Sequence, residues 1–133
     1  MSSVVVDTHA AIWYLSVDPR ISAPAIQAME KAVQSGDPIY VPSICLVEAT
    51  YLVEKGRLPQ IAFDLLVRAI GRAGSGFVIA SLDGATALAL GQVRRESVPD
   101  MPDRIIAATA LSLGLPLVTR DGRIRASGIQ TIW

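Results

Sequence analysis

Residues 4–13, VVVDTHAAIW, decide how this chain folds. The apolar run Val4–Val6 is typical of a short buried strand, and Asp7 ends it. A helix is predicted directly afterwards, over Thr8–Leu15, with Thr8 as a candidate N-terminal cap. A strand that runs straight into a helix is the first half of a βαβ unit, so a parallel sheet is expected.

The rest of the chain continues this alternation. Strands are predicted at Val4–Asp7, Ile39–Val41, Phe77–Ala80, Pro116–Thr119 and Ile129–Ile132. Helices are predicted at Thr8–Leu15, Ser22–Ser35, Ser43–Lys55, Pro59–Arg72, Asp83–Arg95 and Asp103–Leu113. Strands alternating with helices favour an α/β fold in which helices cover both faces of the sheet. We therefore expect three α/β/α layers around a central, mostly parallel sheet of four to five strands.

Composition is consistent with one globular domain over residues 1–133. Hydrophobic residues make up 51% of the chain and charged residues 18%. No apolar run approaches the roughly 20 residues that cross a bilayer, and the N-terminus lacks the features of a signal peptide. The single cysteine, Cys45, is predicted to be a small core residue rather than a nucleophile. A cytoplasmic location is the default expectation.

Four acidic residues occupy matching positions in this pattern. Asp7 and Asp121 each follow an apolar run, Asp103 lies in a first helical turn, and Glu48 lies one turn into a helix that follows a strand. In open α/β sheets, functional groups collect at the carboxyl ends of the strands and at the facing helix N-termini. All four carboxylates are therefore predicted to meet at one edge of the sheet.

Each of these residues also has a simpler interpretation. Asp7 could cap the helix that follows it, and Asp103 could stabilise its own helix N-terminus through the helix dipole. Asp121 could open an Asp-Gly turn, and Glu48 could be an exposed helix residue. Taken singly, Asp103 and Asp121 fit the simpler interpretation better. Taken together, the four positions favour a shared site.

Carboxylates packed together repel one another unless a cation binds them. Mg²⁺ prefers oxygen ligands and is usually held by a few carboxylates and substrate phosphate. One or two such ions can activate water and stabilise the leaving oxygen of a phosphodiester. Asp100 is a further candidate ligand, because it would share a face with Asp103 if that helix begins early; it could equally be a loop residue. No cysteine–histidine cluster is present to form a structural zinc site.

The formal net charge is zero, from 12 basic and 12 acidic residues. If four of the acids hold two divalent cations, the loaded protein would carry about +4. Ten of the basic residues are arginine, which suits bidentate contact with phosphate, and six basic residues lie between Arg94 and Arg125. The alternative is that these arginines are ordinary solvated surface.

Several uncharged or weakly basic side chains lie close to the acids in sequence. His9, the only histidine, could be a general base, although a packed or surface role is the alternative. Thr8, Ser43 and Thr119 could order a metal-bound water through their hydroxyls; helix capping is the alternative for the first two.

Five segments in order resemble the motifs of the PIN-domain nucleases, and especially of VapC-like toxins. They are residues 4–13 (VVVDTHAAIW), 42–48 (PSICLVE), 103–110 (DRIIAATA), 117–121 (LVTRD) and 128–133 (GIQTIW). The resemblance spans nearly the whole chain. It implies a PIN-like fold and a Mg²⁺- or Mn²⁺-dependent endoribonuclease that is commonly neutralised by a small antitoxin and commonly dimeric.

By motif, the resemblance assigns the catalytic metal site to Asp7, Glu48, Asp103 and Asp121. Relatives with this opening often have a His-Arg-Asp-Pro run before the third motif, where this chain has VPDMP at residues 98–102. That departure leaves the role of Asp100 open.

Two other functions compete with this interpretation. A phosphotransfer enzyme with Asp7 as nucleophile would need a lysine near a late strand, whereas Lys31 and Lys55 lie on early helices. A PIN-like fold kept only for protein binding would not need the intact acidic set. For a nuclease, we expect single-stranded or loop RNA as the substrate. The expected antitoxin would place a basic side chain near the acids and cover a groove lined by Ile12, Trp13, Leu52 and Val53.

Overall fold

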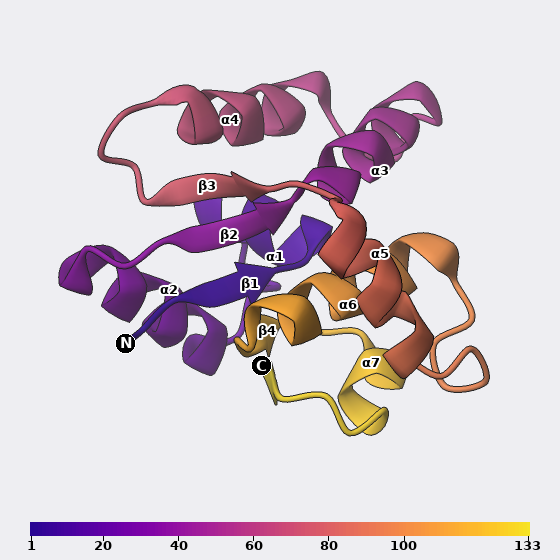
Figure 1. Ribbon diagram of the computed structural model, residues 1–133. Coiled ribbons are helices and arrows are strands. Elements are labelled where there is room, and N and C mark those ends of the chain that lie inside the picture. The colour runs from indigo at the N-terminus through magenta and orange to yellow at the C-terminus, as the bar shows by residue number, and fades with distance from the viewer.

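The computed structural model describes residues 1–133 and contains one five-stranded sheet. In order across the sheet, the strands are β3 (Phe77–Ala80), β2 (Ile39–Pro42), β1 (Val4–Val6), β4 (Leu117–Val118) and β5 (Thr131–Ile132). Every neighbouring pair is parallel. The predicted parallel sheet is confirmed, with β1 at its centre (Figure 1).

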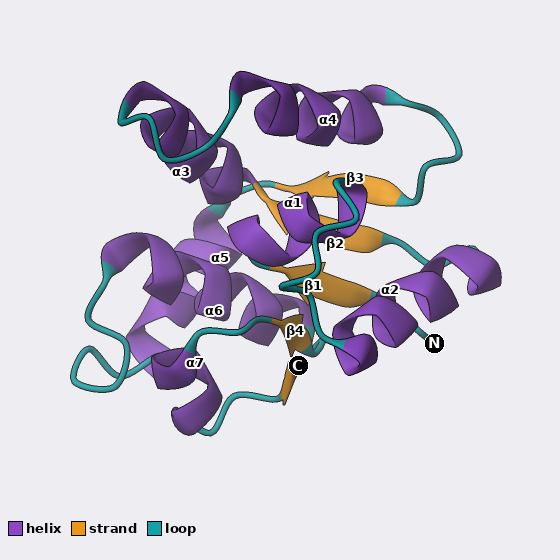
Figure 2. Ribbon diagram, turned by 180° about the vertical axis from the view of Figure 1, so that it is seen from behind, coloured by secondary structure: helices purple, strands orange, loops and turns teal.

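Helices enclose the sheet. Their bounds are α1 Thr8–Leu15, α2 Ala23–Ser35, α3 Ser43–Glu54, α4 Gln60–Gly71, α5 Gly84–Ala89, α6 Met101–Leu113 and α7 Gly122–Ala126. Helices α1 and α2 lie on one side of the sheet, and α5 and α6 lie on the other (Figure 2). Helix α4 packs beside β3 and contacts α1 and α3. The predicted three α/β/α layers are confirmed.

The core forms where the sheet meets these helices. Val5 and Val6 of β1, together with Leu117 of β4, are fully buried, as expected for strands covered on both faces. Cys45 is also fully buried, so its prediction as a core residue is confirmed, and burial raises the pKa of its thiol. Trp13 keeps only 7% of its surface exposed. No helix is both long and apolar enough to cross a membrane.

Three local differences from the sequence prediction bear on the site. Helix α6 begins at Met101 rather than Asp103, because Asp100 caps it and Pro102 occupies its first turn. Residues 122–126, for which no helix was predicted, form the short helix α7 with Asp121 as its cap. The helix expected over Asp83–Arg95 ends as α5 at Ala89 and continues only as a short 3₁₀ turn, Leu90–Gln92.

Candidate metal centre

A cleft of about 660 Å³ lies at the carboxyl edge of the sheet. The strands β1 and β4 end beside it, and helices α1, α6 and α7 begin beside it. Its lining residues are Asp7, Thr8, His9, Trp13, Arg20, Glu48, Asp100, Asp103, Ile106, Arg120, Asp121 and Gly122. The structure therefore brings together the four predicted acids and the further candidate Asp100.

Asp7 sits between β1 and α1 and uses both carboxylate oxygens. Its Oδ1 accepts a hydrogen bond from the backbone N–H of Ala10 at 2.8 Å, which caps α1. Its Oδ2 accepts a hydrogen bond from the Thr119 hydroxyl. Burial raises the pKa of Asp7, and these two hydrogen bonds partly oppose the increase. Asp7, rather than Thr8, is thus the cap of the first helix, and it still faces the cleft.

Glu48 reaches the cleft from the second turn of α3. The hydroxyl of the buried Thr8 donates a hydrogen bond to Glu48 Oε1 at 2.5 Å. This contact crosses from α1 to α3 and fixes one oxygen of the carboxylate. Thr8 therefore orients the Glu48 side chain, a role that the sequence did not predict.

Asp100 immediately precedes α6, and Asp103 lies in the first turn of that helix. The Asp103 backbone N–H donates to Asp100 Oδ2 at 3.2 Å, so Asp100 caps the helix. One carboxylate oxygen from each of Glu48, Asp100 and Asp103 lies within 4.8 Å of the other two. Burial and then the neighbouring carboxylates, Asp100 foremost, raise the pKa of Asp103 to about 7. This is the tightest concentration of negative charge in the cleft.

Asp121 completes the set from the start of α7. Its Oδ1 accepts from the Ile124 backbone N–H at 2.9 Å. Its own backbone N–H donates to Thr119 Oγ1 at 3.0 Å. The fully buried Thr119 hydroxyl therefore joins Asp7 to the backbone of Asp121. A bridging hydroxyl of this kind fixes the relative position of the ends of β1 and β4.

The other predicted polar residues divide between the cleft and its surroundings. His9 is exposed and lines the cleft, with its ring centroid 5.4 Å from that of Trp13. Ser43 does not line the cleft; its hydroxyl accepts from the Leu82 backbone N–H at 3.1 Å. The candidate role of Ser43 in ordering water at the acids is therefore wrong.

Two arginines, Arg20 and Arg120, also line the cleft; the sequence predicted Arg120 only as one of the basic residues between Arg94 and Arg125, and it did not predict Arg20. The position of Arg120 in the sequence pointed to the site, because this residue directly precedes Asp121 at a strand end. Nothing in the sequence pointed to Arg20, because it reaches the cleft from the connection between α1 and α2.

The donor set fits a hard divalent cation. The lining supplies carboxylate oxygens from five residues, one histidine and no cysteine. Oxygen-rich sites of this type suit Mg²⁺ or Mn²⁺ rather than zinc or copper. Fold and cleft together define a parallel α/β protein with an acidic candidate metal site at the carboxyl edge of its sheet.

Known proteins resemble this chain in sequence and fold. The PIN domain family matches residues 4–128. Ribonuclease VapC22 of Mycobacterium tuberculosis is 35% identical over 136 aligned positions, which cover 95% of this chain and 92% of the relative. The chain therefore belongs to the PIN domain family.

Two solved structures extend the comparison. A chain of VapBC from Salmonella typhimurium, crystallised with DNA, superposes with a TM-score of 0.69 at 25% identity, covering 98% of this chain and 97% of that one. A chain of VapBC2 from Rickettsia felis, bound to a DNA fragment from its promoter, gives a TM-score of 0.71 at 17% identity. The latter match covers 97% of this chain and 96% of the other, and it supports the fold.

Proposed function

We propose that residues 1–133 form a single nuclease domain that hydrolyses RNA phosphodiester bonds with a divalent metal ion, as the toxin of a toxin–antitoxin pair. The observation that carries this proposal is the convergence of five carboxylates in one cleft of a PIN-family fold. The ribonuclease name of the Mycobacterium tuberculosis relative supports RNA as the substrate.

Asp7, Glu48, Asp103 and Asp121 would hold Mg²⁺ or Mn²⁺, with Asp100 as a further ligand. The bound ion would activate water and stabilise charge on the phosphodiester. The chain positions the ligands through hydrogen bonds: Thr8 holds Glu48, and Thr119 holds Asp7. Such contacts to metal ligands orient them and keep their oxygens ready to bind.

The competing functions have less support. A phosphotransfer enzyme built on Asp7 would need a lysine in the cleft, and no lysine lines it. A non-catalytic binding module would have no use for three carboxylate oxygens within 4.8 Å of one another, because their mutual repulsion costs stability.

The nuclease proposal is tested with purified protein and single-stranded RNA. We expect cleavage in Mg²⁺ or Mn²⁺, none in excess EDTA, and none from the Asp7→Asn variant. Asp64→Asn is the matched control, because it makes the same chemical change at an exposed position of α4 outside the cleft. Cleavage by Asp7→Asn at the rate of the Asp64→Asn control would refute the proposal.

We further propose that a small antitoxin restrains this activity in the cytoplasm by placing an Arg or Lys near Asp7 and Asp103. The solved VapBC relatives support a protein partner. A basic group would pair with the clustered carboxylates and compete with the metal. A complex with the neighbouring gene product that binds Mn²⁺ and cuts RNA like the free protein would contradict this mechanism.

The apolar surface expected for that partner needs correction. Ile12 is 2% exposed and belongs to the core, whereas Trp13, at 7% exposed, lines the acidic cleft, so neither residue contributes to an apolar groove. The other two predicted residues, Leu52 and Val53, are partly exposed on α3, and further exposed apolar side chains lie on α3 and α4, including Tyr51 at 57% and Ile61 at 70%. We propose that an amphipathic antitoxin segment covers these helices. A homodimer, which would join two basic rims into one RNA path, remains an expectation from the family resemblance.

A further inference from the structure

Trp13 packs against two cations at the rim of the acidic cleft. The guanidinium carbon of Arg20 lies 4.8 Å from the ring centroid of Trp13, and that of Arg120 lies 5.0 Å from it. His9 and Trp133 contact the same indole, at centroid distances of 5.4 and 6.0 Å. Three separate segments of the chain therefore meet on one nearly buried side chain, which positions both guanidinium groups.

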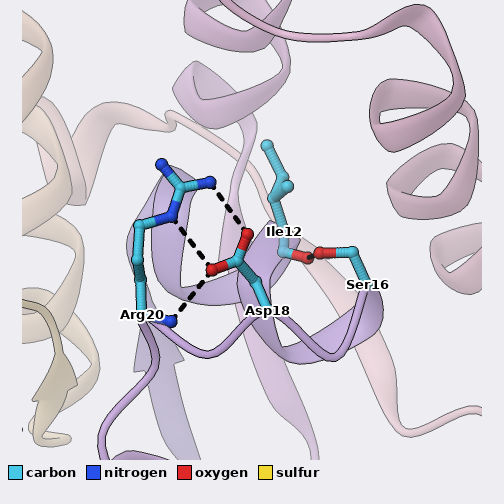
Figure 3. A network of polar contacts seen from close by, with 4 residues as sticks. All are labelled: Ile12, Ser16, Asp18 and Arg20. Carbon is cyan, nitrogen blue, oxygen red and sulfur yellow. Dashed lines mark hydrogen bonds and ion pairs between the residues drawn. The ribbon is translucent and has the colours of Figure 1, made fainter.

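The charge of Arg20 is already paired. Its Nε donates to Asp18 Oδ1 at 2.9 Å and a terminal nitrogen donates to Asp18 Oδ2 at 2.8 Å, a bidentate contact visible in Figure 3. The Arg20 backbone N–H also donates to Asp18 Oδ1. Asp18 and Arg20 belong to the loop between α1 and α2, and the start of this loop is held to α1 because the Ser16 hydroxyl donates a hydrogen bond to the Ile12 carbonyl. Arg20 therefore adds little net charge to the cleft.

Arg120 differs in having no ion pair and no side-chain hydrogen bond. The two ion pairs of the protein are Arg20–Asp18 and Arg94–Glu96, so no cleft carboxylate lies within 4.0 Å of an Arg120 nitrogen. Its backbone is nevertheless fixed, because Thr119 on one side is fully buried and Asp121 on the other caps α7. A guanidinium that rests on an indole face keeps its edge N–H groups free for an anion.

We propose that Arg120, supported by Trp13, binds a phosphate of the RNA strand and holds that strand across the acidic cleft. This inference rests on the proposed nuclease function. Guanidinium and phosphate match in bidentate geometry. A cleft with five carboxylates and a chain of zero net charge needs a local cation to receive a polyanion. A carboxylate from a protein partner would use the same chemistry, and the experiment separates the two.

The test compares Arg120→Gln with Arg123→Gln. Arg123 is exposed on α7, loses the same charge when changed, and does not line the cleft. Binding of a fluorescein-labelled, mixed-sequence single-stranded oligoribonucleotide is measured by anisotropy in Mn²⁺ over a range of salt concentrations. Each change is made in the Asp7→Asn protein so that the RNA is not consumed. Phosphate contacts carry no sequence preference, so this probe is sufficient.

We expect Arg120→Gln to weaken RNA binding about ten-fold or more relative to Arg123→Gln, as loss of a charge-assisted hydrogen bond predicts. The slope of log affinity against log salt should fall by about 0.7, the value for one phosphate contact on a single strand. Arg120→Lys should keep the salt slope but recover only part of the affinity. With Asp7 restored, Arg120→Gln should raise KM about ten-fold and change kcat much less.

Equal affinity and equal salt slope for the Arg120→Gln and Arg123→Gln proteins would overturn the inference, while RNA cleavage by the unchanged protein would leave the nuclease proposal intact. Loss of antitoxin binding by Arg120→Gln with unchanged RNA binding would assign Arg120 to a protein partner instead, and would equally overturn it. An unchanged protein that neither binds nor cuts RNA refutes both proposals.

Discussion

Replacing Thr119 by valine removes the hydroxyl that joins the two sides of the acidic cleft. That hydroxyl donates to the Asp7 carboxylate and accepts from the Asp121 backbone N–H, and Thr119 is fully buried. A hydrogen bond to a charged group contributes about 1.5–3 kcal/mol, and leaving the partly buried Asp121 N–H without an acceptor adds only part of the roughly 1–3 kcal/mol that a fully buried N–H would cost. These contributions overlap, so we expect Thr119→Val to lower the free energy of unfolding by about 2–4 kcal/mol at pH 7.

The cost should depend on pH, and its sign follows from Asp7. Burial already raises the pKa of Asp7 above its ordinary value of 3.8, and the Thr119 hydrogen bond opposes that increase. Removing the hydroxyl therefore raises the pKa of Asp7 further. A carboxyl group whose pKa is higher in the folded than in the unfolded state lowers the free energy of unfolding at pH values above its unfolded-state pKa. This penalty disappears at low pH, where the group is protonated in both states. The cost of Thr119→Val should thus be smaller at about pH 4 than at pH 7.

Urea unfolding at both pH values measures this effect, with Thr109→Val as the matched control. Thr109 is also buried, at 2% exposure, but its hydroxyl donates to the Ile105 carbonyl within α6. Loss of the Thr109 hydroxyl should lower the free energy of unfolding by about 1 kcal/mol or less at either pH, because the Ile105 carbonyl also accepts a backbone hydrogen bond of the helix. A cost for Thr119→Val that equals the control, or that does not change with pH, would refute this account of the cleft.

The sequence predicted the sheet well because buried parallel strands and capped helices leave local signals. Helix α1 has the predicted bounds, and α2 begins after Ser22, whose side chain caps it as expected. Short apolar runs beside turn residues located all five strands to within two residues at each end. The gathering of the acids at one edge followed from this topology, since parallel strands end on the same side.

What the sequence could not supply was the choice among competing local interactions. Asp7, Asp100 and Asp121 each cap a helix and also line the cleft, so the simpler interpretation and the functional one are compatible. Helix α6 starts at Met101, before the predicted start at Asp103, because the Asp100 carboxylate accepts a hydrogen bond from the Asp103 backbone N–H. From the sequence alone, Asp100 and Pro102 made either start plausible. The contacts of Thr8 and Thr119 join residues 40 and 112 positions apart, beyond any local pattern.

Two further predictions concern the carboxylate cluster itself. Asp103→Asn should raise the melting temperature of the metal-free protein at pH 8 and have little effect on it at about pH 4. Burial and neighbouring carboxylates raise the pKa of Asp103 to about 7, so its side chain destabilises the fold at pH 8, where it is ionised, and not at pH 4, where it is protonated. A lower melting temperature of the variant at pH 8, measured by differential scanning calorimetry, would contradict this repulsion. Mn²⁺ binding, measured by titration calorimetry in metal-free protein, should tighten as pH rises from 6 to 8, because the proton on Asp103 competes with the ion below its pKa of about 7. In the Asp103→Asn protein, Mn²⁺ affinity should be weaker and should depend less on pH over this range, because the carboxyl group that binds the competing proton is absent. A pH dependence that survives in Asp103→Asn but disappears in Asp7→Asn would transfer the competing proton to Asp7, and one that survives in both would show that the metal binds away from this cluster.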